Sequence, residues 1–411
     1  MKEVTTNKLR IGTLRVAMAF VAASLFSLLL GDVFSSQADE EREERNEGAV
    51  YVLTNKAEGN TVVAFHRSHD GSLTRIQEAS TGGLGSGPGE LPPGFPPGPG
   101  PNPLDSQDAL VLTRDGRFLL AVNSKSNDVS VFSVTERGLR LVDKVPSGGD
   151  FPVSIAHHNN LIYVLNEGES PDTFVGAVPN MTGFFLDFEG RLHRIPRSTR
   201  ITGKPDSGPS QIVFTPDGEK LIITEMFTNL ISEFGVSEFG LTTNKITFPA
   251  NNRTPLAVSF GRHHLVAITE GNDSGHRTGV PNGATLSTYR LTDEDTLEPV
   301  SKAAAINKTG SCWVRFSPDG RFAFTGDTGS GTVSSFSVSR GGELTLLGAA
   351  DTGGVASVPI DLDITPDGKF LYVLASFSGA VEGFRIEKDG SLKLVANAGG
   401  LPITIQGIVA R

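Results

Sequence analysis

The sequence predicts an all-β protein, a seven-bladed β-propeller made of four-stranded antiparallel blades. Three observations support this prediction. A unit of four short strands lies near the C-terminus, its turns recur about seven times, and the last segment of the chain has no partner except the first unit. Residues 48–411 divide into about 52 residues per unit, close to the propeller range. One closed domain is therefore expected from a chain of 411 residues.

The clearest copy of the unit is the segment IDLDITPDGKFLYVLASFSGAVEGFRIEKDGSLKLV. Its four strands are predicted at Ile360–Thr365, Phe370–Ala375, Val381–Ile386 and Leu392–Val395. The first two are joined by a Pro-Asp-Gly turn, in which proline sets φ and glycine supplies a positive φ. Four such strands bury little surface alone, so we expect the unit to pack against further copies.

The turns of this unit recur along the chain. The turn between first and second strands is repeated as TRDG, TPDG or SPDG from Thr113, Thr215, Ser317 and Thr365. The turn before the fourth strand ends at Leu73, Leu139, Leu192, Leu241, Leu297, Leu344 and Leu392. The first unit starts at its second strand, Ala49–Asn55. We expect Ile403–Val409 to supply the missing inner strand, which closes the ring without an open edge.

The N-terminal segment has the pattern of a secretory signal peptide at residues 1–38, followed by a charged spacer at residues 39–47. Basic residues precede the apolar run Val16–Leu30, and Ser36–Ala38 offers small residues for cleavage. The run is shorter than the ~18 residues of a spanning helix. We expect a secreted or periplasmic protein with no stable membrane span after cleavage. An uncleaved anchor is the alternative.

Composition and missing motifs narrow the function. A net charge of −10 without an evident basic stripe argues against nucleic acid as a partner and favours a small-molecule ligand. The single Cys312 excludes an intramolecular disulfide, and we expect a monomer stabilised by blade packing. HExxH, P-loop, GxSxG, zinc-cluster and dinucleotide motifs are absent from the sequence, which excludes several enzyme classes.

The insertions between strands should gather on one face of the propeller. Residues 82–103 hold eight glycines and eight prolines, so we expect an extended or disordered loop. In the alternative, Leu91, Phe95 and Leu104 act as a lid over one face of the propeller. Further insertions occur at residues 168–178 and 271–284. All three fall on the face where the second strands end. Long loops on one face often mark the functional face.

Polar residues at the ends of the second strands are the predicted site. These residues are Asn55, Asn123, Asn166, Glu225, Glu270 and Asp327, and the starts of the inner strands add Asp108, Asp150, Ser210, Gln211 and Asp361. If they converge, Glu225 and Glu270 are candidate general bases. Substrate binding is assigned to Gln211, His276, Arg277, Asp327, Asn123 and Asn166, the His-Arg pair being suited to an anion. A divalent cation at the carboxylates is a second interpretation, and strand ends that simply reach water are a third.

Several motifs resemble those of the lactonase propellers, which include 6-phosphogluconolactonase-like proteins and fungal carboxymuconate cyclases. They are YVLTN at Tyr51–Asn55, YVLN at Tyr163–Asn166, the repeated PDG and DGSL turns, and Gly208-Pro209 leading to Thr224-Glu225. The repeats are of the YVTN type. The resemblance implies a small-lactone substrate, no required cofactor, and Glu225 as the matching site residue. Where that family has Arg-His after Gly-Pro, this chain has Ser210-Gln211.

Two functions follow from these observations. The first is an exported lactonase-like enzyme that hydrolyses or isomerises a small lactone, with water activated by Glu225 or Glu270. The second is a non-catalytic ligand- or protein-binding propeller at the cell surface or in the extracytoplasmic space.

Overall fold

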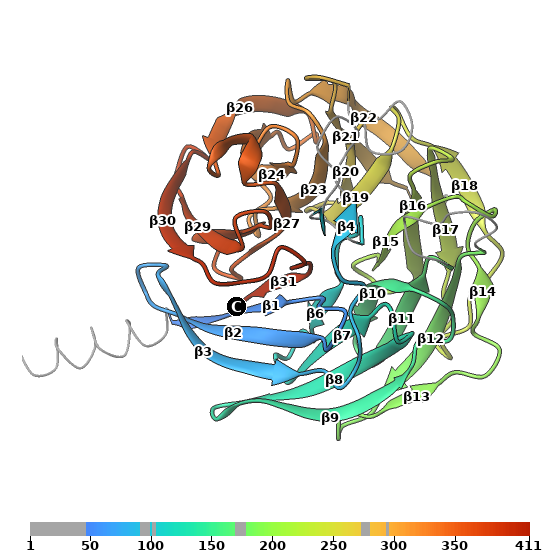
Figure 1. Cartoon of the computed structure of the whole chain (residues 1–411). Coiled ribbons are helices and arrows are strands. Elements are labelled where there is room, and N and C mark those ends of the chain that lie inside the picture. The colour runs from blue at the N-terminus through green and yellow to red at the C-terminus, as the bar shows by residue number, and fades with distance from the viewer. Residues whose placement is uncertain (1–46, 91–98, 101–103, 169–177, 273–279, 293–295) are drawn as a thin grey trace, which may run out of the picture. The chain divides into compact units, whose positions relative to one another are not determined.

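A computed structural model describes residues 47–90, 99–100, 104–168, 178–272, 280–292 and 296–411. These residues form seven sheets arranged radially about an axis, which confirms the predicted seven-bladed propeller (Figure 1). Residues Ala49–Arg411 make up one compact unit. The predicted signal peptide and nearly all of the charged spacer lie outside the described residues. None of the described helices has the length and apolar character needed to span a bilayer.

The blades share one plan, with strands running antiparallel from the axis outward. From inner to outer strand, the first blade holds β31 (Ile408–Ala410), β1 (Gly48–Leu53), β2 (Thr61–Arg67) and β3 (Leu73–Ser80), and the second holds β6 (Leu110–Leu112), β7 (Phe118–Asn123), β8 (Asp128–Thr135) and β9 (Gly138–Pro146). The third blade holds β10 (Pro152–His158), β11 (Leu161–Asn166), β12 (Asn180–Leu186) and the pair β13 (Leu192–Arg194) and β14 (Arg200–Ile201), and the fourth holds β15 (Pro209–Phe214), β16 (Lys220–Glu225), β17 (Leu230–Gly235) and β18 (Ile246–Pro249). The fifth blade holds β19 (Pro255–Phe260), β20 (Leu265–Glu270), β21 (Thr285–Leu291) and β22 (Leu297–Ala305), the sixth holds β23 (Ser311–Phe316), β24 (Phe322–Asp327), β25 (Thr332–Val338) and β26 (Leu344–Asp351), and the seventh holds β27 (Pro359–Ile364), β28 (Phe370–Ala375), β29 (Ala380–Ile386) and β30 (Leu392–Ala398). A hairpin of β4 (Gly89–Glu90) and β5 (Pro99–Gly100) and a short 3₁₀ helix, η1 (Gly354–Ala356), lie outside the blades.

The repeated Asp-Gly turns are held by their own side chains. In the last blade Thr365 Oγ1 donates to Asp367 Oδ1 at 2.6 Å, the same oxygen accepts the Lys369 N–H at 3.1 Å, and Gly368 has φ of 71°. Corresponding hydroxyl–aspartate pairs occur at Thr113–Asp115, Thr215–Asp217 and Ser317–Asp319. We call the side of the propeller that carries these turns the turn face, and the opposite side, where the second strands end, the loop face.

The ring closes as predicted from the sequence. β31 pairs antiparallel with β1 through Val50↔Ala410 and Val52↔Ile408. The paired strand is shorter than the predicted Ile403–Val409, although the Gln406 N–H still donates to the Leu53 carbonyl at 3.0 Å. Sequence ends that lie far apart in the chain therefore share one blade.

Neighbouring blades are also joined by tyrosines of the second strands. Tyr163 Oη donates to the Gly240 carbonyl at 2.5 Å, and Tyr372 Oη donates to the Gly71 carbonyl at 2.8 Å. Each accepting glycine has a positive φ and lies in the turn before the fourth strand of the next blade. The phenol thus buries its ring between blades while its hydroxyl keeps a partner.

The inner strands present an open edge to the axis, and polar side chains bind several of the N–H groups on these edges. The Val258 N–H donates to Gln211 Oε1, the Phe316 N–H to Ser259 Oγ, and the Ile212 N–H to Ser154 Oγ. In every case the acceptor belongs to the preceding blade. Polar residues on the inner strands therefore have a structural role, because a buried N–H without a partner is costly.

Candidate functional site

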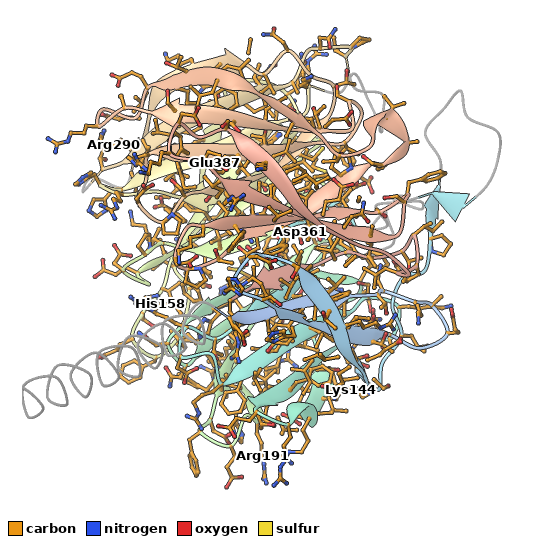
Figure 2. All side chains as sticks on the ribbon, turned by 90° about the vertical axis from the view of Figure 1, so that its left-hand side faces the viewer. Lys144, His158, Arg191, Arg290, Asp361 and Glu387 are labelled. Atoms are coloured by element: carbon orange, nitrogen blue, oxygen red, sulfur yellow. The ribbon has the colours of Figure 1, made fainter. Side chains whose placement is uncertain are left out.

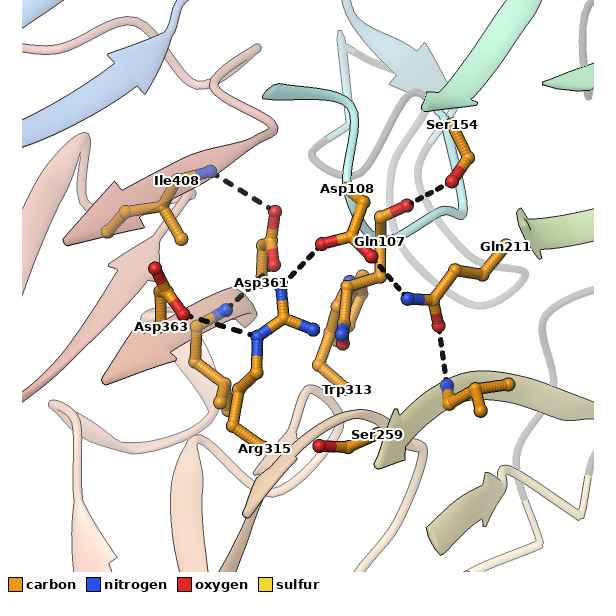
Figure 3. Close-up of polar contacts among 12 residues, drawn as sticks. Gln107, Asp108, Ser154, Gln211, Ser259, Trp313, Arg315, Asp361, Asp363 and Ile408 are labelled. Atoms are coloured by element: carbon orange, nitrogen blue, oxygen red, sulfur yellow. Dashed lines mark hydrogen bonds and ion pairs between the residues drawn. The ribbon is translucent and has the colours of Figure 1, made fainter. Parts of the chain in front are cut away.

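The segment Leu104–Asp108, which we call the axial segment, occupies the centre of the ring. Ser106 Oγ donates to the Val153 carbonyl at 2.8 Å, and the Ser106 carbonyl accepts from Trp313 Nε1 at 3.1 Å and from Gln406 Nε2 at 2.7 Å. Gln107 Oε1 accepts the Val314 N–H at 3.2 Å while its Nε2 donates to the Val314 carbonyl at 3.3 Å. A segment continuous with the Gly/Pro insertion thus binds blades on different sides of the axis (Figure 3).

The structure describes part of the Gly/Pro insertion. Residues 82–103 were expected to form an extended or disordered loop. The structure pairs Gly89–Glu90 with Pro99–Gly100 and buries Leu104, which packs with the hydrophobic core of the first blades. Leu91 and Phe95 lie outside the described residues.

Four charged residues, which we call the axial cluster, surround the end of the axial segment: Asp108, Arg315, Asp361 and Asp363. Arg315 Nη2 binds Asp108 Oδ1 at 2.5 Å, and Arg315 Nε binds Asp363 Oδ1 at 3.3 Å. Arg315 Nη1 has no hydrogen bond within the described ranges, and Figure 3 shows it pointing away from the two ion pairs. One donor of the guanidinium is therefore free for a ligand.

The last blade and the closing strand position the two aspartates of β27. Asp361 lies at an irregularity between Ile360 and Leu362, with φ of 44°, and accepts the N–H groups of Leu362 at 2.9 Å and Ile408 at 3.2 Å. Asp363 Oδ2 accepts the Ala410 N–H at 2.9 Å. The axial cluster is complete only when β31 closes the ring.

Gln211 fixes the remaining carboxylate. Its Nε2 donates to Asp108 Oδ2 at 2.5 Å, and its Oε1 accepts the Val258 N–H at 2.5 Å, so the orientation of the amide is determined. Both oxygens of Asp108 are therefore engaged, one by Arg315 and the other by Gln211. Of the residues predicted for substrate binding, Gln211 is the one that contacts this cluster.

Burial and mutual charge determine the protonation of the cluster. Burial raises the pKa of Asp361 to about 8. Repulsion from Asp108 and Asp363 adds to this shift, whereas attraction to Arg315 opposes it. Burial also raises the pKa of Asp363, again opposed by Arg315. Burial disfavours the charged form of Arg315, but the carboxylates, Asp108 foremost, outweigh it and raise the pKa of the guanidinium. Burial and the neighbouring carboxylates therefore favour the protonated form of Asp361, and the carboxylates favour the charged form of Arg315.

Solvent reaches the cluster from the turn face. The side chains of Asp108, Arg315 and Asp363 retain 15%, 17% and 21% exposure. Nearer the loop face, the inner-strand residues that contact or flank the axial segment are buried; they are Ser154, Gln211, Trp313 and Asp361. Inner strands run from the loop face to the turn face, so Arg315 and Asp363 lie closer to the turn face than Trp313 and Asp361 of the same strands.

The acids predicted at the strand ends are bound within their own blades. Glu225 accepts from Ser232 Oγ, from Thr228 Oγ1 at 2.9 Å and from Lys245 Nζ at 2.7 Å. All of these partners belong to the fourth blade or to its connections. The carboxylate is buried, although Lys245 keeps 26% exposure.

Glu270 and Asp327 follow the same rule. Glu270 accepts from Thr285 Oγ1 at 2.6 Å and from Ser287 Oγ at 2.9 Å. Burial raises the pKa of Glu270, and the hydroxyl donors oppose the shift. Burial likewise raises the pKa of Asp327, whose hydroxyl donors are Ser311, Thr325, Thr332 and Ser334. Within the described ranges no hydrogen bond or ion pair joins Glu225, Glu270 and Asp327 to one another, and a catalytic role for them stays a prediction.

The predicted amide residues also bind locally. Asn123 Nδ2 donates to Asp128 Oδ1 at 2.6 Å, and Asn166 Nδ2 donates to Asn180 Oδ1 at 3.1 Å. His276 and Arg277, the predicted anion-binding pair, lie outside the described residues, and their role stays a prediction.

Comparison with known proteins identifies the family. A family model described as lactonase, 7-bladed beta-propeller, matches residues 45–175 and 282–402, which together make more than half of the chain. The chain belongs to this lactonase propeller family. The two matched ranges contain Asp108, Arg315, Asp361 and Asp363, whereas Gln211, Glu225 and Glu270 lie between them.

Solved structures of similar fold cover nearly the whole propeller. A protein proposed to be a 6-phosphogluconolactonase from Bacteroides fragilis has 20% identity and a TM-score of 0.67, covering 89% of this chain and 98% of that chain. The periplasmic gluconolactonase of Pseudomonas aeruginosa has 15% identity and a TM-score of 0.64, covering 88% and 98%. At these identities the likeness shows the fold. No relative was found among the curated proteins.

Sequence reasoning missed two members of the axial cluster in this lactonase propeller, Arg315 and Asp363. The available signal was a charged residue inside an otherwise apolar inner strand, as in CWVRF and IDLDI. Such a residue must be paired or must border solvent, because burial of an isolated charge is costly. Across the described residues, no three His, Cys, Asp or Glu side chains are grouped in a way that could hold a metal ion.

Proposed function

We propose that this lactonase propeller hydrolyses a small lactone at the axial cluster, which the substrate reaches from the turn face. The observation that carries the proposal is the partly exposed Arg315, whose free Nη1 lies beside carboxylates at the centre of the ring. Membership of the lactonase family supports the reaction class.

In the proposed reaction, Asp363 is the general base. It is the most exposed carboxylate of the cluster, and its raised pKa makes it a better proton acceptor than an ordinary aspartate. Asp363 takes a proton from water as the water oxygen bonds to the lactone carbonyl carbon. Arg315 Nη1 donates to the oxyanion that develops there. When the ring C–O bond breaks, Asp363 returns the proton to the leaving alkoxide, and the product is a hydroxy acid.

Asp361 is too deeply buried to contact the substrate. We assign it a positioning role, because its proton reduces the negative charge that would otherwise bind Arg315 more tightly. Gln211 has a similar role through Asp108, whose second oxygen it holds at 2.5 Å. Arg315 then has a defined orientation with Nη1 unengaged.

A panel of aldonolactones and simple γ- and δ-lactones tests the proposal. Asp363→Asn should lower kcat at least about 100-fold, since general-base catalysis contributes that much. Glu225→Gln should keep kcat in the folded protein. Loss of activity in Glu225→Gln with no loss in Asp363→Asn would return the base to the residue predicted from sequence. Absence of turnover across the whole panel would reject the lactonase proposal.

A non-catalytic binding propeller is the second candidate, and the axial segment favours it. The protein's own chain fills the loop side of the axis, which leaves a small exposed part of the cluster for a ligand. Arg315 would then bind the carboxylate of a hydroxy acid. Stabilisation of the wild type by gluconate, absent in Arg315→Gln and without turnover of any lactone, would support this candidate.

Export to the periplasm or beyond the cell is also part of the proposal. It is supported by the leader pattern of residues 1–38, and the similar P. aeruginosa protein is described as periplasmic. Mass spectrometry of the N-terminus after cell fractionation tests it. A mature chain that begins near Asp39 in the exported fraction is expected, and a full-length chain in the cytoplasm would contradict it.

A further inference from the structure

The outer edge of the third blade differs from the other outer edges. Its fourth strand is broken into β13 and β14, both paired with β12. Between them Ser198 takes the place of a backbone partner, since its Oγ accepts the Gly183 N–H at 3.0 Å. Figure 1 places β13 and β14 on the outer rim, far from the axis.

This broken strand is strongly basic in an acidic protein, which corrects the interpretation of the sequence as one without an evident basic stripe. Residues 191–204 contain four arginines, one lysine and one histidine, with no acid, although the chain has a net charge of −10. At the turn-face end, Arg191 pairs with Glu189 at 3.0 Å and His193 with Asp187 at 2.8 Å. The rest of the segment carries four exposed cations, which we call the rim stripe: Arg194, Arg197, Arg200 and Lys204.

The rim stripe has no carboxylate partners in the described part of the chain. Arg194 donates to Thr199 Oγ1 at 2.8 Å, and Arg200 donates to the Arg197 carbonyl at 3.0 Å. Some cations on other outer strands are paired with carboxylates, as Arg75 is with Glu78 at 2.5 Å and Lys144 with Asp128 at 3.2 Å. Charged residues on an edge strand prevent aggregation, and the paired charges of β3 and β9 show that an outer edge can carry charge without an excess of cations. The stripe therefore concentrates positive charge beyond what edge protection needs.

Apolar side chains flank these cations. Ile201, next to Arg200, is 66% exposed, and Phe188, in the turn before β13, is 76% exposed. Figure 2 labels Arg191 at the outer margin of the molecule and Asp361 in its interior, so this surface is remote from the axial cluster. Cations that flank exposed apolar side chains are typical of segments that bind the interface of anionic membranes.

We propose that the rim stripe docks the propeller edge-on to a membrane rich in anionic lipids. The cations bind lipid phosphates while Ile201 enters the headgroup region. A single-stranded nucleic acid fits less well, because residues 191–204 contain no Phe, Tyr or Trp on which bases could stack. The inference is independent of the lactonase proposal, since none of these residues contacts the axial cluster.

Vesicle co-sedimentation of the full chain tests the proposal. Vesicles of phosphatidylcholine with phosphatidylglycerol are compared with phosphatidylcholine alone, at low and high salt. Each cation near an anionic surface is worth about fivefold in partitioning. The variant R194Q/R197Q/R200Q/K204Q should therefore lose at least about tenfold in binding to the anionic vesicles.

A matched control removes the same charge elsewhere, at exposed cations of blades five to seven: K302Q/R340Q/K388Q/K393Q. This variant keeps the N-terminal segment of the wild type. It should bind anionic vesicles within about twofold of wild type, since salt screens the attraction between the membrane and cations far from the rim stripe. Both variants should unfold at the wild-type urea midpoint. Equal losses in the two variants would overturn the proposal. Binding to single-stranded RNA without binding to the anionic vesicles would also overturn it.

Discussion

The amide of Gln107 should contribute several kcal/mol to stability, because it joins the axial segment to both backbone groups of Val314 in β23. Gln107→Leu keeps the size of the side chain but leaves the Val314 N–H and carbonyl without their partners at 3.2 and 3.3 Å. Val314 is fully buried, so water cannot replace the amide. Each buried group left unpaired costs about 1–3 kcal/mol, which gives about 2–6 kcal/mol for the pair.

Gln77→Leu is the matched control. Gln77 bonds the backbone of Leu139 in the same two-point manner, with Nε2 to the carbonyl at 2.9 Å and the N–H to Oε1 at 2.7 Å. That pair lies near the outer edge of the propeller, where solvent can replace a lost bond, so its loss should cost about 1 kcal/mol or less.

Urea unfolding at pH 7, followed by tryptophan fluorescence, measures both variants. Trp313 is a suitable probe because its Nε1 donates to Ser106 in the axial segment. We expect Gln107→Leu to be at least about 1.5 kcal/mol less stable than Gln77→Leu, with an unchanged dependence on urea. Equal costs in the two variants would show that the axial segment is not held by this bond.

Three further predictions concern other parts of the propeller. Burial, with repulsion from Asp351, raises the pKa of Glu382 to about 7, and one of its oxygens has no partner among the described residues. The folded state therefore holds this proton more tightly than the unfolded state, so the contribution of Glu382 to stability is full below about pH 4 and is lost as pH rises through about 7. Glu382→Gln should raise the urea midpoint at pH 8 and change it little at pH 4; an equal change at both would refute the assignment. Tyr372→Phe leaves the Gly71 carbonyl without its donor at 2.8 Å and should cost about 1–2 kcal/mol in the same assay, whereas a variant as stable as wild type would show that water replaces the hydroxyl. EDTA should leave the melting temperature unchanged, because Arg315 occupies the space between the axial carboxylates; a fall of several degrees would favour the divalent cation considered from sequence.

Local signals in the sequence were sufficient to predict the blades and their closure. The Pro-Asp-Gly turn at Asp367 and Gly368 is made by side chains within a few residues of each other, so the repeated Asp-Gly turns mark the inner hairpins of four blades. The pairing of β31 with β1 followed from an unpaired strand at each end of the repeat, since an open ring would leave two edges.

The candidate site could be predicted only in part. Asp108, Gln211 and Asp361 were recognised as polar residues at the start of inner strands, a position that the repeat alone defines. Convergence of Glu225 with Glu270 was predicted from their shared strand position. However, the direction of each side chain depends on hydroxyls of the adjacent third strand, Ser232 and Ser287, which turn the carboxylates into their own blades.

What the sequence determined by itself was the repeating unit, because strand periodicity and turn chemistry act over a few residues. Only the tertiary structure determined which residues lie at the centre of the ring and contact one another there. Gln107 and Val314 lie 207 residues apart, as do Asp108 and Arg315, and a polar residue gives no local indication of which distant group it will meet. The site depends on ring closure, since Asp361 and Asp363 gain the N–H donors of Ile408 and Ala410 only when β31 returns to the first blade.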